Sequence, residues 1–501
     1  MKSMKKVFLI PALIILASCA DLEVENTLAP DAGRALANPS DLISLVGGAA
    51  GDVFYDQHGV AGTVHYDLQS DILTATNNAY GFWHVCDQPR REIVNNTGYS
   101  EYFYIQDTWD YNITAITNLT SVIKAVKSGV VLTDENDVDV TAKVLAMAYF
   151  VRGVAHGTIA MVYDQGYAIN EDTDLITLEL TDYKTVMAEA ISSLEQAIDI
   201  IDSEGVASVD FYPQSGVTFT GAEFKQLCSS YAARYMLGVA RNSTEAASLN
   251  YATIKAYAEA GITEDFTVVT DGSVLAPEDL NFIQYRIAAD AAYIPVDQMI
   301  AHLFDPNNQP ADYPTGSTVL PKPVTDDARL DLYYEYSTNF GFLNASRNRL
   351  LFSNLQLSRY PENINPPSYA GTRVPFMLAS EMDYIIAECE WQLGNNSTAL
   401  GIINGSARST IGELPAANDA SDAGILNLLH YEHAIELAHT GKAINWGFMR
   451  RHDMLQTGTP LHWAVPAREL EILGLPLYTY GSSARADGVN TADGSNSWNG
   501  N

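Results

Sequence analysis

Apolar residues return at spacings of three and four in several separate stretches of this chain, and this period constrains the fold more than any other feature. In residues 141–166 the recurring positions fall on one face of a helix, and they are Val144, Ala148, Val151, Ala155, Ile159 and Val162. Other stretches with helical character cover residues 41–54, 99–127, 182–201, 221–240, 248–262, 376–394, 398–408 and 424–441. The sequence therefore predicts a mostly α-helical fold.

Only short breaks separate several of these stretches, which favours antiparallel helical hairpins. Trp391, Leu393, Gly394 and Ala399 approach the W-x-x-L-G…A spacing of tetratricopeptide repeats but are one residue short of it. Gly394 is also placed to end one helix, and Ser397 to cap the next. We predict a scaffold of tetratricopeptide-like hairpins (an α-α superhelix).

Residues 267–368 interrupt this periodicity. They are rich in Pro, Asn, Asp and Tyr and carry no sustained helical stripe. A segment this long without regular structure is more often a binding region than filler. We expect an irregular, loop-rich lobe with short strands, and we divide the chain into a signal peptide (1–18), an N-terminal helical region (19–266) and a C-terminal region (267–501) that carries this insertion.

The first nineteen residues have the pattern of an export signal. Three lysines precede an apolar run over residues 7–16, which is shorter than the roughly 20 residues of a membrane span. Residues 16–19, Leu-Ala-Ser-Cys, resemble a bacterial lipobox, in which cleavage before the cysteine leaves a lipid on its thiol. The alternative is an ordinary signal peptide with a chance cysteine. We predict a lipid anchor on Cys19.

Charge and cysteine content narrow the possible partners. The chain has 61 acidic and 28 basic residues, a formal net charge of -33, so a nucleic-acid partner is not expected. Without Cys19, three distant cysteines remain and no CxxC occurs, which argues against a disulfide framework or a zinc site. We expect Cys228 and Cys389, both in helical stretches, to be buried apolar residues.

The order of the segments resembles the SusD/RagB family of outer-membrane lipoproteins from Bacteroidetes. The resemblance runs from Cys19 to near Gly481 and rests on loosely specified blocks rather than on one tight motif. These blocks are residues 36–51, 109–119, 146–169, 379–412 and 431–451. In residues 379–412, an acid, an aromatic residue, a pair of aliphatic residues and Ala-Glu are followed by Leu-Gly, then Ala, then Asn-x-x-Arg. The last block departs from the family pattern at His433, Thr440 and Ala443, where an Arg, an acid and a second Arg are usual.

This resemblance implies a role outside the cell. SusD-like proteins sit on the outer leaflet, cover a TonB-dependent barrel of the SusC type, bind nutrient, most often glycan, and are generally not enzymes. The acids that follow the anchor (Asp21, Glu23 and Glu25) resemble the segment that sends many such lipoproteins to the cell surface, although acids are common throughout this chain. The expected partners are therefore a SusC-like transporter, an oligosaccharide or polysaccharide, and the outer membrane through the anchor.

Glycan binding needs flat aromatic faces for sugar C–H groups, with amides, acids or Arg for the hydroxyls. Two stretches offer this mixture. The candidate ligand-binding residues are Asn77, Tyr80, Phe82, Trp83, Asp87 and Arg90 in the first stretch, and Tyr334 and Tyr336 in the second. Trp83 is the best single candidate for stacking on a sugar. Each stretch could instead pack into the protein, Trp83 as a plug between loop and body and the tyrosines as a half-buried strand.

Other chemistries find less support. His430, His433 and Glu436 have a spacing that could ligate zinc, but no further ligand is marked, so we interpret them as structural. A glycoside hydrolase of helical fold would need two facing carboxylates, and Glu388 and Glu390 do not face each other on a helix. We expect no catalytic residues and no cofactor beyond the lipid. Calcium among the loop acids, and peptide instead of glycan as ligand, are left open.

Overall fold

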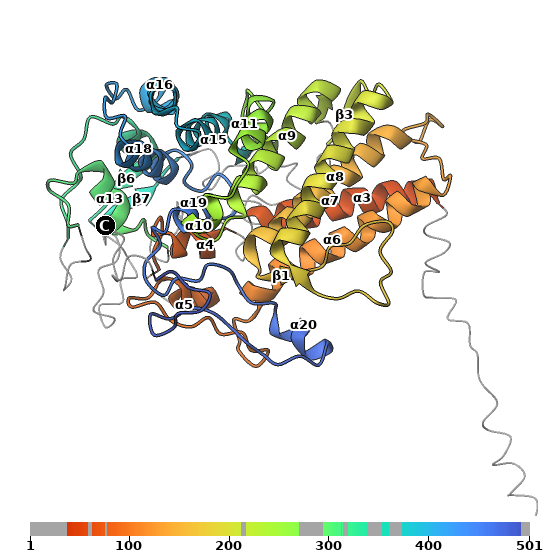
Figure 1. Cartoon of the computed structure of the whole chain (residues 1–501), viewed down its shortest axis with the longest axis horizontal. Helices are drawn as coiled ribbons and strands as arrows, with labels where there is room; N and C mark the ends of the chain where they lie inside the picture. Colours follow the sequence, from red (N-terminus) through yellow and green to blue (C-terminus); the bar gives the residue numbers. More distant parts are fainter. Residues whose placement is uncertain are drawn as a thin grey trace, which may run out of the picture.

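The structure is a computed structural model that describes residues 38–58, 63–75, 78–211, 217–269, 294–311, 313, 319–338, 353–359 and 373–491. The predicted signal peptide and Cys19 lie outside the described residues. Within them, helices dominate and strands are short, as the sequence predicts (Figure 1).

The N-terminal half is a stack of antiparallel helices. Its long members are α3 (Pro39–His58), α6 (Phe103–Lys127), α7 (Thr141–Val162), α8 (Tyr183–Ser203), α9 (Gly221–Gly238) and α11 (Tyr251–Glu259). Each packs on its neighbours in chain order, α3 on α6, α6 on α7, α7 on α8 and α8 on α9. α3 and α6 run in opposite directions, because Asp56 near the end of α3 accepts a hydrogen bond from Thr108 near the start of α6, at 2.8 Å. The predicted hairpin scaffold is confirmed.

α7 is the central helix of this stack, and it differs from the sequence prediction in one respect. The stripe predicts one apolar face, whereas every residue from Ala146 to Val162 is buried. α3 and α6 cover one part of its circumference, and α8 and α9 cover another. Glycines allow this close approach, since a side chain at Gly157 would overlap the ring of Tyr235 on α9. α7 is long and apolar enough to cross a membrane, but here it packs inside the protein.

The C-terminal half returns to helices and packs against the N-terminal stack. Its members are α15 (Ala379–Gln392), α16 (Asn396–Gly405), α17 (Ala407–Thr410), α18 (Asp422–Ile435), α19 (Ile444–Arg451) and α20 (Ala467–Ile472). Gly394 follows α15 with φ +83°, as predicted for a helix end. The prediction that Ser397 caps α16 is wrong, because α16 begins at Asn396, two residues before the predicted start, and Asn395 precedes it. α18 ends six residues before Gly441, and His439 and Ala443 adopt positive φ beyond it.

The strands of the described residues form two-stranded antiparallel ribbons. They pair β1 (Gln165–Gly166) with β2 (Thr181–Asp182), β3 (Ser208–Asp210) with β4 (Thr218–Thr220), β5 (Phe266–Val269) with β8 (Arg373–Met377), and β6 (Tyr334–Tyr336) with β7 (Leu355–Leu357). β5 enters the predicted insertion and β8 leaves it, so the insertion departs from the helical body and returns to it through one ribbon. The β6–β7 ribbon lies within the insertion.

Short helices complete the fold. They are α4 (Val64–Gln69), a 3-10 turn η1 (Ala79–Gly81), α5 (Phe82–Cys86), α10 (Ser243–Ala246), α13 (Gln298–Phe304) and α14 (Arg329–Tyr333). The part of the insertion that carries α13, β6 and β7 lies beside α18 (Figure 1). Cys86, Cys228 and Cys389 are buried free thiols, and burial raises the pKa of the Cys228 and Cys389 thiols above the ordinary range.

A cluster of buried ions fastens the insertion to α18. Arg329 is fully buried and bonds Asp327 at 2.8 Å, Glu432 at 2.6 Å and Glu436 at 3.4 Å. Arg359 reaches the other oxygen of Glu436 at 2.8 Å. Buried charges are tolerated only when they are paired in this way. We call this group, together with Arg408, the Arg329 cluster.

Candidate functional site

The first predicted binding stretch forms a loop between α4 and α6 that contains α5, and we call residues 78–96 the aromatic loop. Asn78 organises its first part: its side-chain oxygen accepts the Trp83 backbone N–H at 3.1 Å, and its amide nitrogen approaches the Tyr99 hydroxyl at 3.4 Å. The backbone N–H of Tyr80 donates to Glu101 at 3.1 Å. These bonds fix the turn from which Tyr80 and Trp83 project.

The structure sorts the predicted aromatics by exposure. Phe82 is 1% exposed, and its ring lies 5.2 Å from the imidazole of His65, so it packs in the core. Tyr80 and Trp83 are half-buried, with one side of each against the core. Asn77 lies outside the described residues. Tyr80 and Trp83 are therefore the members of this stretch that present surface to a ligand in this conformation.

Tyr99 is a third aromatic residue next to this stretch, linked to it through Asn78. The sequence did not single it out, because its position continues the helical pattern of residues 99–127. α6 begins at Phe103, so Tyr99 instead lies in the turn before the helix, half-buried. Its ring meets that of His84 edge-on, with centroids 5.4 Å apart. We call Tyr80, Trp83 and Tyr99 the aromatic cluster. Its rings and the neighbouring Asn78 amide supply the two kinds of contact that a sugar requires.

Asp87 and Arg90 belong to the aromatic loop, but their side chains are buried inside the protein instead of lying on its surface. Asp87 is 1% exposed and pairs with Arg91 at 2.6 Å, whereas Arg90 is 3% exposed. The Arg90 guanidinium bonds the carboxylate of Asp71 at 2.7 Å and the hydroxyl of Thr459 at 3.0 Å. In this conformation both side chains hold the loop in place and do not reach a ligand.

The second predicted stretch lies on a different element, the β6–β7 ribbon. Tyr334 is 4% exposed and packs edge-on against Phe304 of α13, with centroids 5.6 Å apart. Tyr336 is half-buried, and its hydroxyl donates to the Leu320 carbonyl at 2.7 Å. The structure places α5 and the β6–β7 ribbon on separate parts of the fold (Figure 1). The two predicted stretches are therefore two separate candidate surfaces.

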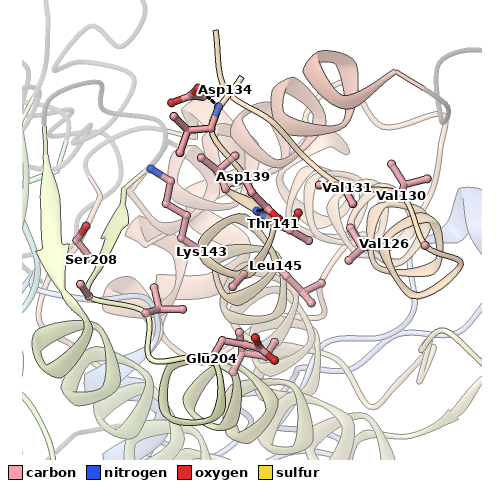
Figure 2. Close-up of a pocket in the computed structure, with 17 residues that line it drawn as sticks. Val126, Val130, Val131, Asp134, Asp139, Thr141, Lys143, Leu145, Glu204 and Ser208 are labelled. Atoms are coloured by element: carbon pink, nitrogen blue, oxygen red, sulfur yellow. Dashed lines mark hydrogen bonds between the residues drawn. The ribbon is translucent and has the colours of Figure 1, made fainter. Parts of the chain in front are cut away.

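A groove of about 840 Å³ opens at the other end of the helical stack. Figure 2 shows it between the end of α6, the start of α7 and the end of α8, with Val126, Val131 and Leu145 among its walls. Acids stand at its rim, and Lys143 there is paired with Asp210 at 2.6 Å. Among the described residues that line it, none is aromatic.

α6 separates this groove from the aromatic cluster. Phe103, at the start of α6, meets Tyr80 edge-on at 5.6 Å, while Val126, near the end of α6, lines the groove. A helix of 25 residues is about 37 Å long. The groove is aliphatic and acidic and lacks the flat rings that sugars need, so the aromatic cluster is the better candidate for a glycan.

The whole fold is shared with solved proteins. One is a SusD superfamily protein from Bacteroides vulgatus, with a TM-score of 0.55 and 11% identity over 83% of this chain and 88% of that one. A second is a SusD-like carbohydrate binding protein from the same species, with a TM-score of 0.55 and 12% identity over 84% of this chain and 86% of that one. A third is surface glycan-binding protein A from Bacteroides uniformis, with a TM-score of 0.56 and 12% identity over 88% of this chain and 99% of that one. This chain has the SusD-like fold. A scan of family models finds no match to the sequence, and a search of curated proteins finds no similar one. The resemblance drawn from sequence blocks is thus confirmed at the level of fold.

The departures from the family pattern are accommodated within the SusD-like fold. His433 stacks on Phe448 with centroids 4.1 Å apart, and one ring nitrogen lies 2.8 Å from the Leu429 carbonyl oxygen. Burial lowers the pKa of His433 to about 3, so the ring is neutral. Ala443 adopts φ 61° at the start of α19. His433 thus serves as a packed neutral ring in the core.

The acidic residues considered above for a zinc site or for hydrolysis form ion pairs with other side chains of the protein. Glu436 is held by Arg329 and Arg359, and no group of three metal-binding side chains occurs among the described residues. Glu388 is buried and bonds Arg451 at 2.7 Å, and Glu390 is paired with Lys255 at 2.5 Å. Although burial opposes it, the positive charge of Arg451 lowers the pKa of Glu388 below its ordinary range. A carboxylate held ionised in this way is a poor general acid.

Proposed function

We propose that this protein binds oligosaccharide or polysaccharide at the aromatic cluster and passes it to a SusC-like TonB-dependent transporter, without hydrolysing it. The observation that carries the proposal is the SusD-like fold, which the chain shares over more than four fifths of its length with proteins described as carbohydrate binding and glycan binding. The half-buried rings of Tyr80 and Trp83 beside the Asn78 amide supply the chemistry. Family membership in SusD/RagB belongs to the same proposal.

The location we propose is the outer membrane, with a lipid on Cys19 and the protein facing the exterior. Several buried acyl chains would anchor it durably, because each methylene contributes roughly 0.8 kcal/mol. The net charge of -33 suits a body that stands beside a membrane and binds neutral ligands.

The partner contact we propose lies at the end of α20 and on the segment that follows it. Ile472, Leu473, Leu475 and Leu477 are 70%, 41%, 45% and 45% exposed, an unusual concentration of aliphatic surface. Exposed apolar patches of this kind mark protein interaction sites. Replacing Leu475 and Leu477 by Asp should reduce co-purification with the transporter and leave glycan retention unchanged.

The binding proposal is tested by affinity electrophoresis of the purified protein against a glycan panel, with reducing ends assayed in the same mixtures. We expect retardation without new reducing ends. Trp83→Ala should weaken retention about fivefold to thirtyfold, because stacking on a large aromatic contributes roughly 1–2 kcal/mol. The matched control is Trp391→Ala, since Trp391 is also half-buried but lies on α15. Both variants should keep the wild-type circular dichroism.

Other outcomes would overturn the proposal. New reducing ends would indicate a hydrolase. Retention of peptides but of no glycan would indicate a peptide receptor with the same fold. Equal loss of retention in the Trp83 and Trp391 variants would show that the aromatic cluster is not the binding surface.

A further inference from the structure

A second buried polar cluster joins the aromatic loop to the insertion, and we call Asp71, Arg90, Asp297, Tyr313 and Gln456 the Asp297 junction. Asp71, Arg90, Asp297 and Gln456 are each no more than 3% exposed. They come from three distant parts of the chain, around residues 71–90, 297 and 456. Residues 72–74 and 295–297 pair through backbone bonds, among them Thr74 N–H to the Pro295 carbonyl at 2.9 Å.

The Tyr313 hydroxyl lies between the two carboxylates of this junction. It is 3.2 Å from an oxygen of Asp71 and 3.2 Å from both oxygens of Asp297. The Gln456 amide N–H groups donate to Asp71 at 2.7 Å and to the Tyr313 oxygen at 3.2 Å. Arg90 donates to the same Asp71 oxygen at 2.7 Å.

Among the described residues, the donors of the junction are one proton short of what its acceptors require. A tyrosine hydroxyl has a single hydrogen and cannot donate to two carboxylates at once. If Asp297 is protonated on Oδ2, it donates to the Tyr313 hydroxyl, and the hydroxyl donates to Asp71. The other Asp297 oxygen is free to accept the Met299 N–H, which lies at 2.9 Å. With Asp297 ionised, a lone pair of Tyr313 would face a carboxylate, and one Arg would face two buried negative charges.

Burial and then the charge of Asp71 raise the pKa of Asp297 well above its ordinary value, against the opposing effects of the Met299 N–H, Arg90 and Tyr313. The titratable or charged side chains that face Asp297 among the described residues are Asp71, Arg90 and Tyr313. Titratable groups elsewhere on the packed elements include His302 and Asp305 on and after α13, His84 and Cys86 on α5, and Asp422, His430, Tyr431, Glu432 and His433 on α18. The hydrogen-bond count and the burial of Asp297 therefore both favour a protonated Asp297 side chain.

The junction bears directly on the aromatic cluster. Arg90 follows α5 by four residues, and the Asp87 N–H that ends α5 donates to the Trp83 carbonyl. Arg90 thus fixes the loop that carries Tyr80 and Trp83, and Asp297 and Tyr313 connect Arg90, through Asp71, to the insertion. We propose that Asp297 is a positioning residue: the proton it shares with Asp71 through Tyr313 holds the aromatic loop in its ligand-binding position. This inference rests on the proposed glycan binding and adds pH regulation of the same site.

The expected behaviour follows from the sign of the titration. The junction is fully bonded while Asp297 keeps its proton, and it weakens as the pH rises through the raised native pKa of that residue. Glycan retention by the full chain should then fall about threefold to tenfold as the competent conformation loses population. In Asp297→Asn the amide N–H replaces the acid O–H and does not titrate, so retention should stay constant over the same pH range.

The experiment compares wild type, Asp297→Asn and the control Asp182→Asn across mildly acidic to mildly alkaline pH. Asp182 is also a helix N-cap aspartate, at α8, and is remote from the junction. Asp71→Asn provides a second variant: removing that negative charge lowers the pKa of Asp297 and should move the loss of retention to lower pH. A purely structural role for Asp297 would change the amount of binding without changing the shape of its pH profile.

A second readout separates this inference from the proposed function. Trp83 fluorescence, taken as the difference between each protein and its Trp83→Phe form, follows the loop without any glycan. If wild type retains no glycan at any pH, the proposed function fails, while a pH-dependent Trp83 signal that Asp297→Asn abolishes still supports the junction. Superimposable pH profiles of wild type and Asp297→Asn, in retention and in fluorescence, would overturn the inference.

Discussion

The two buried clusters that fasten the insertion to the rest of the molecule differ in their balance of charge. The Arg329 cluster sets Arg329, Arg359 and Arg408 against Asp327, Glu432 and Glu436, three cations against three anions. The Asp297 junction sets Arg90 against Asp71 and Asp297, one cation against two anions.

This difference shows how buried carboxylates and arginines can form either a constant attachment or one whose strength depends on pH. A balanced cluster is satisfied with every group ionised, so it stays the same across the physiological pH range. An unbalanced cluster needs a proton to be satisfied, so its strength depends on pH. The balanced cluster lies against helix α18, whereas the unbalanced one lies under the aromatic loop.

Removing Arg329 should have the largest effect. Arg329→Met leaves three buried carboxylates with two partly exposed arginines, and we expect a loss of about 3–5 kcal/mol in the free energy of unfolding. The variant should also acquire the pH dependence of the junction, because one anion is now in excess. Urea unfolding followed by circular dichroism at two pH values measures both effects. A loss that does not change with pH would contradict the charge-balance argument.

Removing Arg90 should lower the free energy of unfolding by a smaller amount, since the junction can take up a second proton. For Arg90→Met we expect a loss of about 2 kcal/mol at neutral pH from the unpaired Asp71. Protonation of the junction in acid would remove the unpaired buried charge, so the deficit in stability should shrink as the pH falls. Unfolding at acidic pH should therefore recover most of the wild-type stability, and a constant deficit would argue against proton uptake.

Arg408→Met should have the smallest effect. Its side chain is 13% exposed, and it meets Glu432 by a single contact of 3.4 Å, so water can replace it. We expect a loss of no more than about 1 kcal/mol. Thermal unfolding beside Arg329→Met provides the comparison, and an equal loss in the two variants would show that burial does not set the contribution of each arginine.

The helical scaffold could be predicted from the sequence because its signal is local. The spacing of Val144, Ala148 and Val151 identifies α7 without reference to any other part of the chain, and Gly394 marks the end of α15 by its own backbone preference. The burial of α7 on all sides from Ala146 to Val162 could not be predicted from this spacing, because the number of helices around α7 is a property of the tertiary fold.

The candidate site could be predicted only in part. The aromatic composition of residues 77–91 indicates the loop, but its composition cannot separate Trp83, which keeps an exposed side, from Phe82, which is buried one residue away. The junction could not be found at all, since Asp71, Asp297 and Gln456 lie hundreds of residues apart and nothing in the sequence pairs them. Arg90 was selected for its chemistry, and the structure gives that chemistry an internal partner.

The β5–β8 ribbon has a consequence for how such a receptor can change. Because the two ends of the insertion are already held together, lengthening the intervening chain adds little closure entropy, about 0.6 kcal/mol for each doubling. Mutation can therefore lengthen or shorten the segment while the helices keep their packing, provided that the side chains anchored in the two buried clusters, Asp297, Arg329 and Arg359 among them, are retained. Chain length can thus change there during evolution without refolding the helical body.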